Sequence, residues 1–222
     1  MAEVRAQRRA LAALLVTLAA VFLWSAIHPH DYFTWVLEVW PAAAGVVVLA
    51  ATYPRFRFTT LVYGMIWAHA VVLLVGGHYT YAEVPPFDWM RAHFHLARND
   101  YDRVGHFAQG FVPALVAREV LIRRDVVRGR GWLSFVVVCI CLAVSAAYEL
   151  LEWRVAVASG SAADAFLGTQ GDPWDTQEDM ATALAGAFSA LLLVGRAHDR
   201  QIERIAGRSI EHSLRGGPLG QD

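Results

Sequence analysis

The sequence contains very little cysteine and no lysine, and each absence limits what the chain can be. Its two cysteines, Cys139 and Cys141, lie two positions apart in one apolar run. On a helix these positions fall on different faces, which argues against a disulfide between them and leaves the redox compartment undetermined. All 19 basic residues are arginine, a bias to which we attach no functional meaning. The chain also lacks internal repeats and low-complexity segments, which excludes a repeat architecture.

Motifs of the common enzyme classes are absent as well. The sequence contains no G-x-S-x-G nucleophile motif, no P-loop and no dinucleotide-binding fingerprint. It also lacks the H-E-x-x-H motif and any Glu-x-x-His pair, so neither a zinc-protease nor a di-iron signature is present. No motif in the sequence therefore identifies a reaction.

Charge is scarce, and the apolar residues come in long blocks. Hydrophobic residues make up 56% of the chain and charged residues 18%, whereas soluble chains interleave their charges. Six runs approach the roughly 20 residues that a bilayer core requires: residues 10–27, 32–52, 58–75, 103–122, 132–153 and 178–194. The first run lacks a cleavage site, so we interpret it as a span. The sequence predicts an all-α, polytopic membrane protein whose single transmembrane domain covers residues 1–196.

Arginine is distributed unevenly among the predicted connections. The N-terminus, the turn at 53–58, the loop at 123–131 and the C-terminal tail carry most of it. The positive-inside rule then places both termini in the cytoplasm, as an even number of spans requires. Residues 197–222 form the predicted cytoplasmic tail. Its apolar stripe (Ile202, Ile205, Ala206 and Ile210) predicts an amphipathic helix lying on the anionic leaflet.

Polar residues gather at the predicted outer ends of three spans. They are Asp102, His106 and Gln109 on the fourth span, Glu149 and Glu152 on the fifth, and Asp175 and Asp179 on the sixth. Spacings of three or four place each set on one helical face. Further candidates on other spans are Glu38, His69 and His78. Because carboxylates inside a bilayer are costly, this convergence predicts a site near the outer leaflet.

Two kinds of chemistry fit a histidine surrounded by carboxylates. One is general acid–base catalysis, for which the candidates are His106, Glu149 and Asp179. The other is a divalent metal ion, the one cofactor that we consider. Its candidate ligands are Asp102, His106, Glu149, Glu152, Asp175 and Asp179.

Several of these residues also have a purely structural interpretation. Asp175 or Thr176 can cap the last span, with Glu178 or Asp179 closing a capping box. Asp102 can cap the fourth span in the same way. Glu149 is different, because it lies at the end of its helix where the dipole disfavours an anion, so it needs a partner. The candidate partners are His106, Arg103, Arg154 or a metal ion. We expect His198 and His212 to lie outside the site.

Three blocks of the sequence resemble a known family. YDRVGHFAQGFVPALVAREVLIR, AAYELLEW and GDPWDTQEDMATALAGA are similar to the YjdF family of bacterial inner-membrane proteins. The same blocks are more distantly similar to the VanZ-like membrane proteins, with Glu152 in place of a glutamine and Ala183 in place of an asparagine. The resemblance implies a multi-pass protein of the bacterial inner membrane with a polar site shared by three helices. It implies no reaction.

Three functions remain open from the sequence. The first is a protein that acts on or binds a lipid or a cell-envelope precursor at the outer leaflet. The second is a transporter coupled to cations or protons, and the third is a scaffold without catalytic activity. We expect the lipid bilayer as partner, a lipid or lipid-linked ligand at the site, and no nucleic acid.

Overall fold

A computed structural model of the chain describes residues 2–160, 164–207 and 214. Every regular element in these ranges is helical, which confirms the predicted all-α fold class. In chain order the elements are α1 (Ala2–Ser25), α2 (Tyr32–Thr52), α3 (Thr60–Tyr79), η1 (Tyr81–Glu83), α4 (Pro85–Phe94), α5 (Tyr101–Arg123), α6 (Arg130–Ser159), α7 (Asp164–Leu167), α8 (Asp175–Ser189), the π-helical segment η3 (Ala190–Val194) and α9 (Gly195–Ala206).

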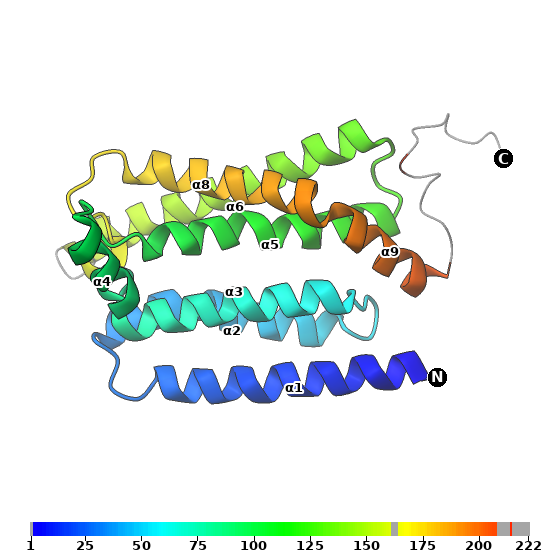
Figure 1. The fold of residues 1–222 in the computed structure, drawn as a ribbon, viewed down its shortest axis with the longest axis horizontal. Coiled ribbons are helices and arrows are strands. Elements are labelled where there is room, and N and C mark those ends of the chain that lie inside the picture. Colours follow the sequence, from blue (N-terminus) through cyan, green and yellow to red (C-terminus); the bar gives the residue numbers. More distant parts are fainter. Residues whose placement is uncertain (1, 161–163, 208–213, 215–222) are drawn as a thin grey trace.

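Five helical segments are long and apolar enough to cross a membrane: α1, α2, α3, α6 and the continuous run from α8 to α9. Helix α5 has 23 residues, but both of its ends carry charged side chains that lower its hydropathy. It nevertheless lies parallel to its neighbours inside the bundle (Figure 1). A sixth crossing by α5 therefore stays a prediction.

The long helices form two layers along one axis. Figure 1 shows α1, α2 and α3 in one layer and α5, α6 and α8 in the other. Helix α5 packs against α3, α6 and α8, so it connects the two layers. The apolar core between the helices includes Val62, Leu115, Val137, Cys141 and Ala187, all with no exposed surface. This core fills the middle of the bundle and leaves polar residues for the ends.

Two glycines let α5 and α8 approach until their backbones touch. A Cβ atom on Gly110 would overlap the carbonyl group of Ala183, and one on Gly186 would overlap the carbonyl oxygen of Phe107. Small residues at such positions permit close helix packing in membrane proteins. The contact fixes the start of α8 beside the start of α5, which is where the polar residues of both helices meet.

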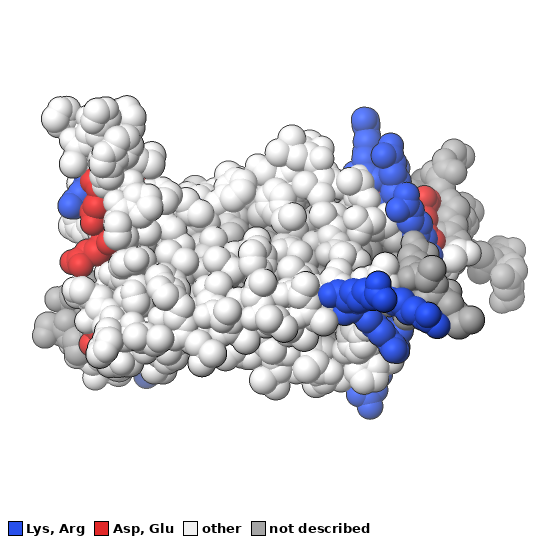
Figure 2. All heavy atoms as spheres, turned by 60° about the horizontal axis from the view of Figure 1, so that its bottom comes forward, with Lys and Arg blue, Asp and Glu red and all other residues white. Residues whose placement is uncertain are grey.

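The two ends of the bundle differ in charge. Arginine side chains gather at one end, and several acidic side chains are visible at the other (Figure 2). We call them the arginine-rich end, where α1 begins and α9 lies, and the acidic end, where α4 lies and α5 and α8 begin. The orientation of these ends in the membrane stays a prediction.

The apolar face of the C-terminal helix packs partly against the bundle, whereas the sequence predicts a helix that lies on the membrane surface. Helix α9 continues directly from η3, and its Ile202 is fully buried against the bundle. Ile205 is 41% exposed, and Ile210 lies outside the described residues. The helix is therefore held at least partly by protein contacts, because Ile202 joins the main core.

Candidate functional site

The loops before α5 and α8 are tied together, and this positions the polar residues of both helices. The backbone N–H of Asn99 donates to Gln170 Oε1 at 2.9 Å, and Gln170 Nε2 donates back to the carbonyl oxygen of Asn99 at 2.9 Å. The buried Asn99 side chain also donates to the carbonyl oxygen of Val84 at 3.1 Å. The two helix starts are thus held in register before their side chains interact.

The capping interpretation of the aspartates is wrong. Trp174 is the N-cap residue of α8 and Asp100 that of α5, and neither makes a side-chain capping bond. Asp175 and Asp102 lie in the first turns instead, where their carboxylates bind arginines. Glu178 binds Arg103 at 2.7 Å, so no capping box forms. The acids of these turns therefore interact with arginines and not with the N-termini of their helices.

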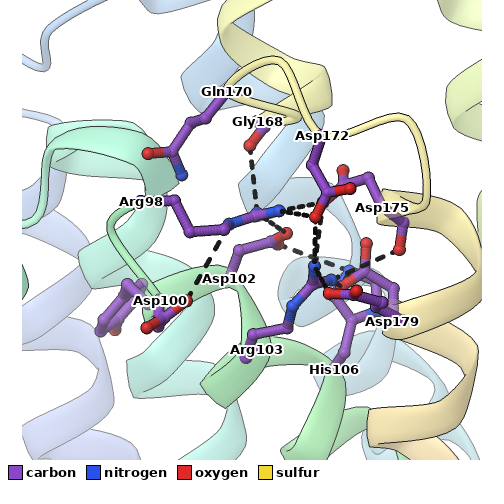
Figure 3. Close-up of polar contacts among 12 residues, drawn as sticks. Arg98, Asp100, Asp102, Arg103, His106, Gly168, Gln170, Asp172, Asp175 and Asp179 are labelled. Atoms are coloured by element: carbon purple, nitrogen blue, oxygen red, sulfur yellow. Dashed lines mark hydrogen bonds and ion pairs between the residues drawn. The ribbon is translucent and has the colours of Figure 1, made fainter. Parts of the chain in front are cut away.

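Two arginines, the buried Arg98 and the half-buried Arg103, hold the acids in place. Arg98 bonds to Asp175, to Asp102 Oδ2 at 3.3 Å and to the carbonyl oxygen of Gly168 at 3.3 Å (Figure 3). Arg103 bonds to Asp179 and contacts Asp175 Oδ1 at 3.3 Å. Burial lowers the pKa of Arg98, but the hydrogen bond and charge of Asp175 outweigh it, so the pKa lies above its ordinary value.

Arg98 and Gln170 were not predicted as members of this arrangement, and no contact was predicted for Asp172. All three lie in loops, where neither helical spacing nor hydropathy indicates what a side chain contacts. The four-residue separation of Arg98 from Asp102 was the only available signal. Asp172 contacts Arg98 at 3.4 Å and Arg103 at 3.5 Å, so it joins both arginines.

His106 lies at the centre, with carboxylates on both sides of its ring. Its Nε2 atom is 3.4 Å from Asp102 Oδ1 and 3.6 Å from Asp179 Oδ1. Its Nδ1 atom is 3.2 Å from Gln109 Oε1 and 3.7 Å from Glu149 Oε1. Since the amide oxygen of Gln109 can only accept, Nδ1 carries a proton in this geometry. Nε2 then directs a lone pair, or a second proton, toward two carboxylate oxygens.

Glu149 is the least satisfied carboxylate of the group. Its side chain is 6% exposed, and its Oε1 atom has no hydrogen-bond partner among the described residues. Of its predicted partners, His106 lies near it, although the 3.7 Å between Nδ1 and Oε1 is too long for a hydrogen bond. Arg154, another predicted partner, stacks on Trp153 instead. An unpaired buried carboxylate oxygen is costly unless a proton, a metal or a ligand satisfies it.

The structure places the remaining candidates at different distances from this centre. Glu152 makes no hydrogen bond or ion pair with any described residue. Glu38 on α2 is buried, and its carboxylate interacts with Asp102 and Tyr81. His69 is half-buried on α3, near enough to His106 for their charges to interact. His78 lies apart, with its Nδ1 atom 3.1 Å from the carbonyl oxygen of Ser25.

Three of the predicted metal ligands come together. Among the described residues, one ligand atom each from Asp102, His106 and Asp179 lies within 4.8 Å of the others, and all three residues are buried. We call the group of Arg98, Asp102, Arg103, His106, Glu149, Asp172, Asp175 and Asp179 the acidic-end site. Its five carboxylates face two guanidinium groups, so it carries an excess of negative charge that favours a cation.

A second buried polar network lies at the arginine-rich end, where the sequence analysis expected none. The fully buried Glu119 accepts bonds from the backbone N–H of Thr59 at 3.0 Å and its hydroxyl at 2.8 Å. It also accepts from Arg123 at 2.7 Å and contacts His198 Nε2 at 3.1 Å. His198 is outside the acidic-end site, as expected; its partner Glu119 was missed because the two lie 79 positions apart.

Comparison with known proteins agrees with this membrane architecture. A family model described as "Predicted membrane protein (DUF2238)" matches residues 10–200. The chain is 50% identical over 190 residues to "Inner membrane protein YjdF" of Escherichia coli (strain K12), covering 86% of this chain and 91% of that protein. No solved structure shows detectable similarity. The predicted inner-membrane location is thus confirmed, and the chain belongs to the YjdF family of inner-membrane proteins.

Proposed function

We propose that the acidic-end site is a divalent-cation centre that binds or acts on a lipid or lipid-linked envelope precursor at the outer leaflet. The observation that supports it best is the placement of His106 Nε2 between Asp102 Oδ1 and Asp179 Oδ1. A lone pair facing two carboxylate oxygens is repulsive unless a positive charge lies between them. That charge is either a second proton on the imidazole or a metal ion.

The distances between His106 Nε2 and the two carboxylate oxygens suit a shared metal ion. Around a tetrahedral ion with bonds of about 2.1 Å, neighbouring ligand atoms lie about 3.4 Å apart. The distances from His106 Nε2 to the two oxygens are 3.4 and 3.6 Å. Arg98 bonds to Oδ2 of Asp102, the oxygen that does not face His106, as an outer-shell partner of a ligating carboxylate does. Arg103 bonds to Asp179 Oδ1, the same oxygen that faces His106, so metal binding requires this oxygen to serve both the ion and the arginine.

Glu149 supplies the acid–base group in this proposal. Its unpartnered oxygen lies on the Nδ1 side of His106, so it is near the three ligands without being one of them. A carboxylate in that position can activate a water molecule or accept a proton from a bound hydroxyl group.

The surroundings favour a lipid headgroup as ligand. Trp89, Trp153 and Trp174 are all at least 58% exposed and lie at this end of the bundle. Exposed tryptophans mark the depth of the lipid headgroups. A cation at that depth, with an acid–base group beside it, suits a phosphate or another anionic headgroup.

Transport is supported less well. A transport path requires polar residues across the bundle, but α5 presents the fully buried Ala114 and Leu115 between the acidic-end site and Glu119. Val137 and Cys141 of α6 belong to the same apolar core. This arrangement favours a site that opens at one end only.

The test is elemental analysis of the detergent-purified protein after incubation with zinc, manganese or magnesium and removal of free metal. We expect near-stoichiometric metal in the wild type and at least a tenfold loss of metal affinity in His106→Ala and Asp179→Asn, because each removes a ligand. Glu149→Gln should keep the metal. Binding should also weaken as the pH falls, because metal ligands must be deprotonated.

The matched control is Glu83→Gln, which neutralises an exposed acid at the same end of the bundle, outside the three-ligand group and without contact to its arginines. It should keep the metal. A wild type that stays metal-free with all three metals, or equal loss in Glu83→Gln and Asp179→Asn, would refute the metal centre. In that case His106 holds the second proton and the site is a structural ion-pair network.

A further inference from the structure

A groove opens at the arginine-rich end, far from the acidic-end site. It has a volume of about 420 Å³ and lies between the start of α6 and the segment where η3 passes into α9. Figure 1 shows α6 and α9 diverging at this end. Its lining combines three arginines and one aspartate with apolar side chains: Arg118, Arg130, Arg196, Asp199, Leu192 and Leu193.

The charges of this groove are not balanced among the described residues. Arg118 is buried and paired with Asp199, which fixes both side chains at the groove wall. Arg130 and Arg196 are exposed, and no described residue forms an ion pair or hydrogen bond with either. The groove therefore presents two uncompensated guanidinium groups, and guanidinium groups bind phosphate oxygens in a bidentate manner.

The apolar part of the groove belongs to the last helical run that is long and apolar enough to cross a membrane. Leu192 and Leu193 are 80% and 79% exposed, and both lie in η3 just before Arg196. Trp132, two positions after Arg130, is 68% exposed, as is typical of a side chain at headgroup depth. A molecule bound here meets cationic groups at the membrane surface and leucine side chains below them.

We propose that this groove binds one anionic phospholipid, with its phosphate between Arg130 and Arg196 and an acyl chain along Leu192 and Leu193. Basic pockets between membrane helices are suited to anionic headgroups. A zwitterionic lipid offers the same acyl chains but carries a cationic group that two arginines repel. The proposal does not depend on the metal centre at the opposite end.

The test is native mass spectrometry of the full-length protein in detergent, titrated separately with phosphatidylglycerol and phosphatidylcholine. We expect one phosphatidylglycerol bound at least tenfold more tightly than phosphatidylcholine. The double variant Arg130→Gln/Arg196→Gln should lose most of this preference, since each surface arginine contributes about 1 kcal/mol to anionic lipid binding, or about fivefold in affinity.

The matched control is Arg200→Gln/Arg204→Gln, which removes the same charge from exposed positions of α9 that do not line the groove. Its phosphatidylglycerol affinity should change less than twofold. Equal losses in the two double variants would show general surface attraction and overturn the proposal. So would equal binding of the two lipids, or displacement of phosphatidylglycerol by millimolar inorganic phosphate. Thermal unfolding of each variant shows whether it remains folded during the titration.

Discussion

The variant Glu119→Ala is expected to lower the free energy of unfolding by about 3–5 kcal/mol, the range for breaking a buried ion pair by removing one partner. Glu119 has no exposed surface and is the common acceptor for Thr59, Arg123 and His198. Its removal leaves the backbone N–H of Thr59 and two basic side chains without their acceptor. Because these partners come from α3, α5 and α9, the loss loosens three elements at once.

The measurement is denaturant unfolding in detergent, followed by the near-ultraviolet signal of the tryptophans. The control is Glu83→Ala, because Glu83 is 57% exposed and contacts His30 at 3.3 Å. Exposed ion pairs contribute less than about 1 kcal/mol. Equal destabilisation by the two variants would show that the network of Glu119 contributes no more than a surface pair.

The helices could be predicted from the sequence because a bilayer demands long apolar runs. The run at 32–52 coincides with α2 (Tyr32–Thr52), and the run at 132–153 lies inside α6 (Arg130–Ser159). The prediction was weaker where charges interrupt the pattern. Helix α5 carries charges at both ends, and α9 follows η3 without a break. Hydropathy records how apolar a segment is and contains no information on which protein surface it packs against.

The centre of the acidic-end site followed from helical spacing. Asp102 and His106 are four apart, and this places both on the face that α8 covers with Asp179. The arginines that neutralise the aspartates were harder to predict. Arg98 precedes α5, and its contact with Asp175 joins positions 77 apart. Such contacts depend on how two loops pack, and one sequence carries no signal for that.

The contacts of Gly110 and Gly186 also join residues that lie far apart in the sequence. Gly110 and Gly186 both lie in the sequence blocks quoted above, but no packing role was predicted for either. Their role emerges only when α5 and α8 are placed together, since each Cβ would meet the backbone of the other helix. Backbone atoms cannot rotate away as a side chain does, so these two positions tolerate no added carbon without a shift of a whole helix.

We therefore expect Gly110→Ala to destabilise the protein by about 3 kcal/mol or more, at the upper end of the usual cost of overpacking. The control is Gly45→Ala on α2, where the new methyl group meets nothing within 4 Å. Alanine is the better helix former by about 0.5–1 kcal/mol, so Gly45→Ala should be neutral or slightly stabilising. Thermal unfolding of both variants in the same detergent gives the comparison.

The same substitution also links the packing of α5 and α8 to the proposed metal centre. A methyl group on Gly110 of α5 pushes Ala183 and the rest of α8 away. This separates Asp179, one turn before Ala183, from His106 and Asp102, because both of these distances cross the α5–α8 contact. Metal affinity should fall at least tenfold in folded Gly110→Ala and remain at the wild-type value in Gly45→Ala. Folded Gly110→Ala with undiminished metal would show that the centre does not require this helix contact. Loss of metal in Gly45→Ala would show that the assay responds to any change in the bundle.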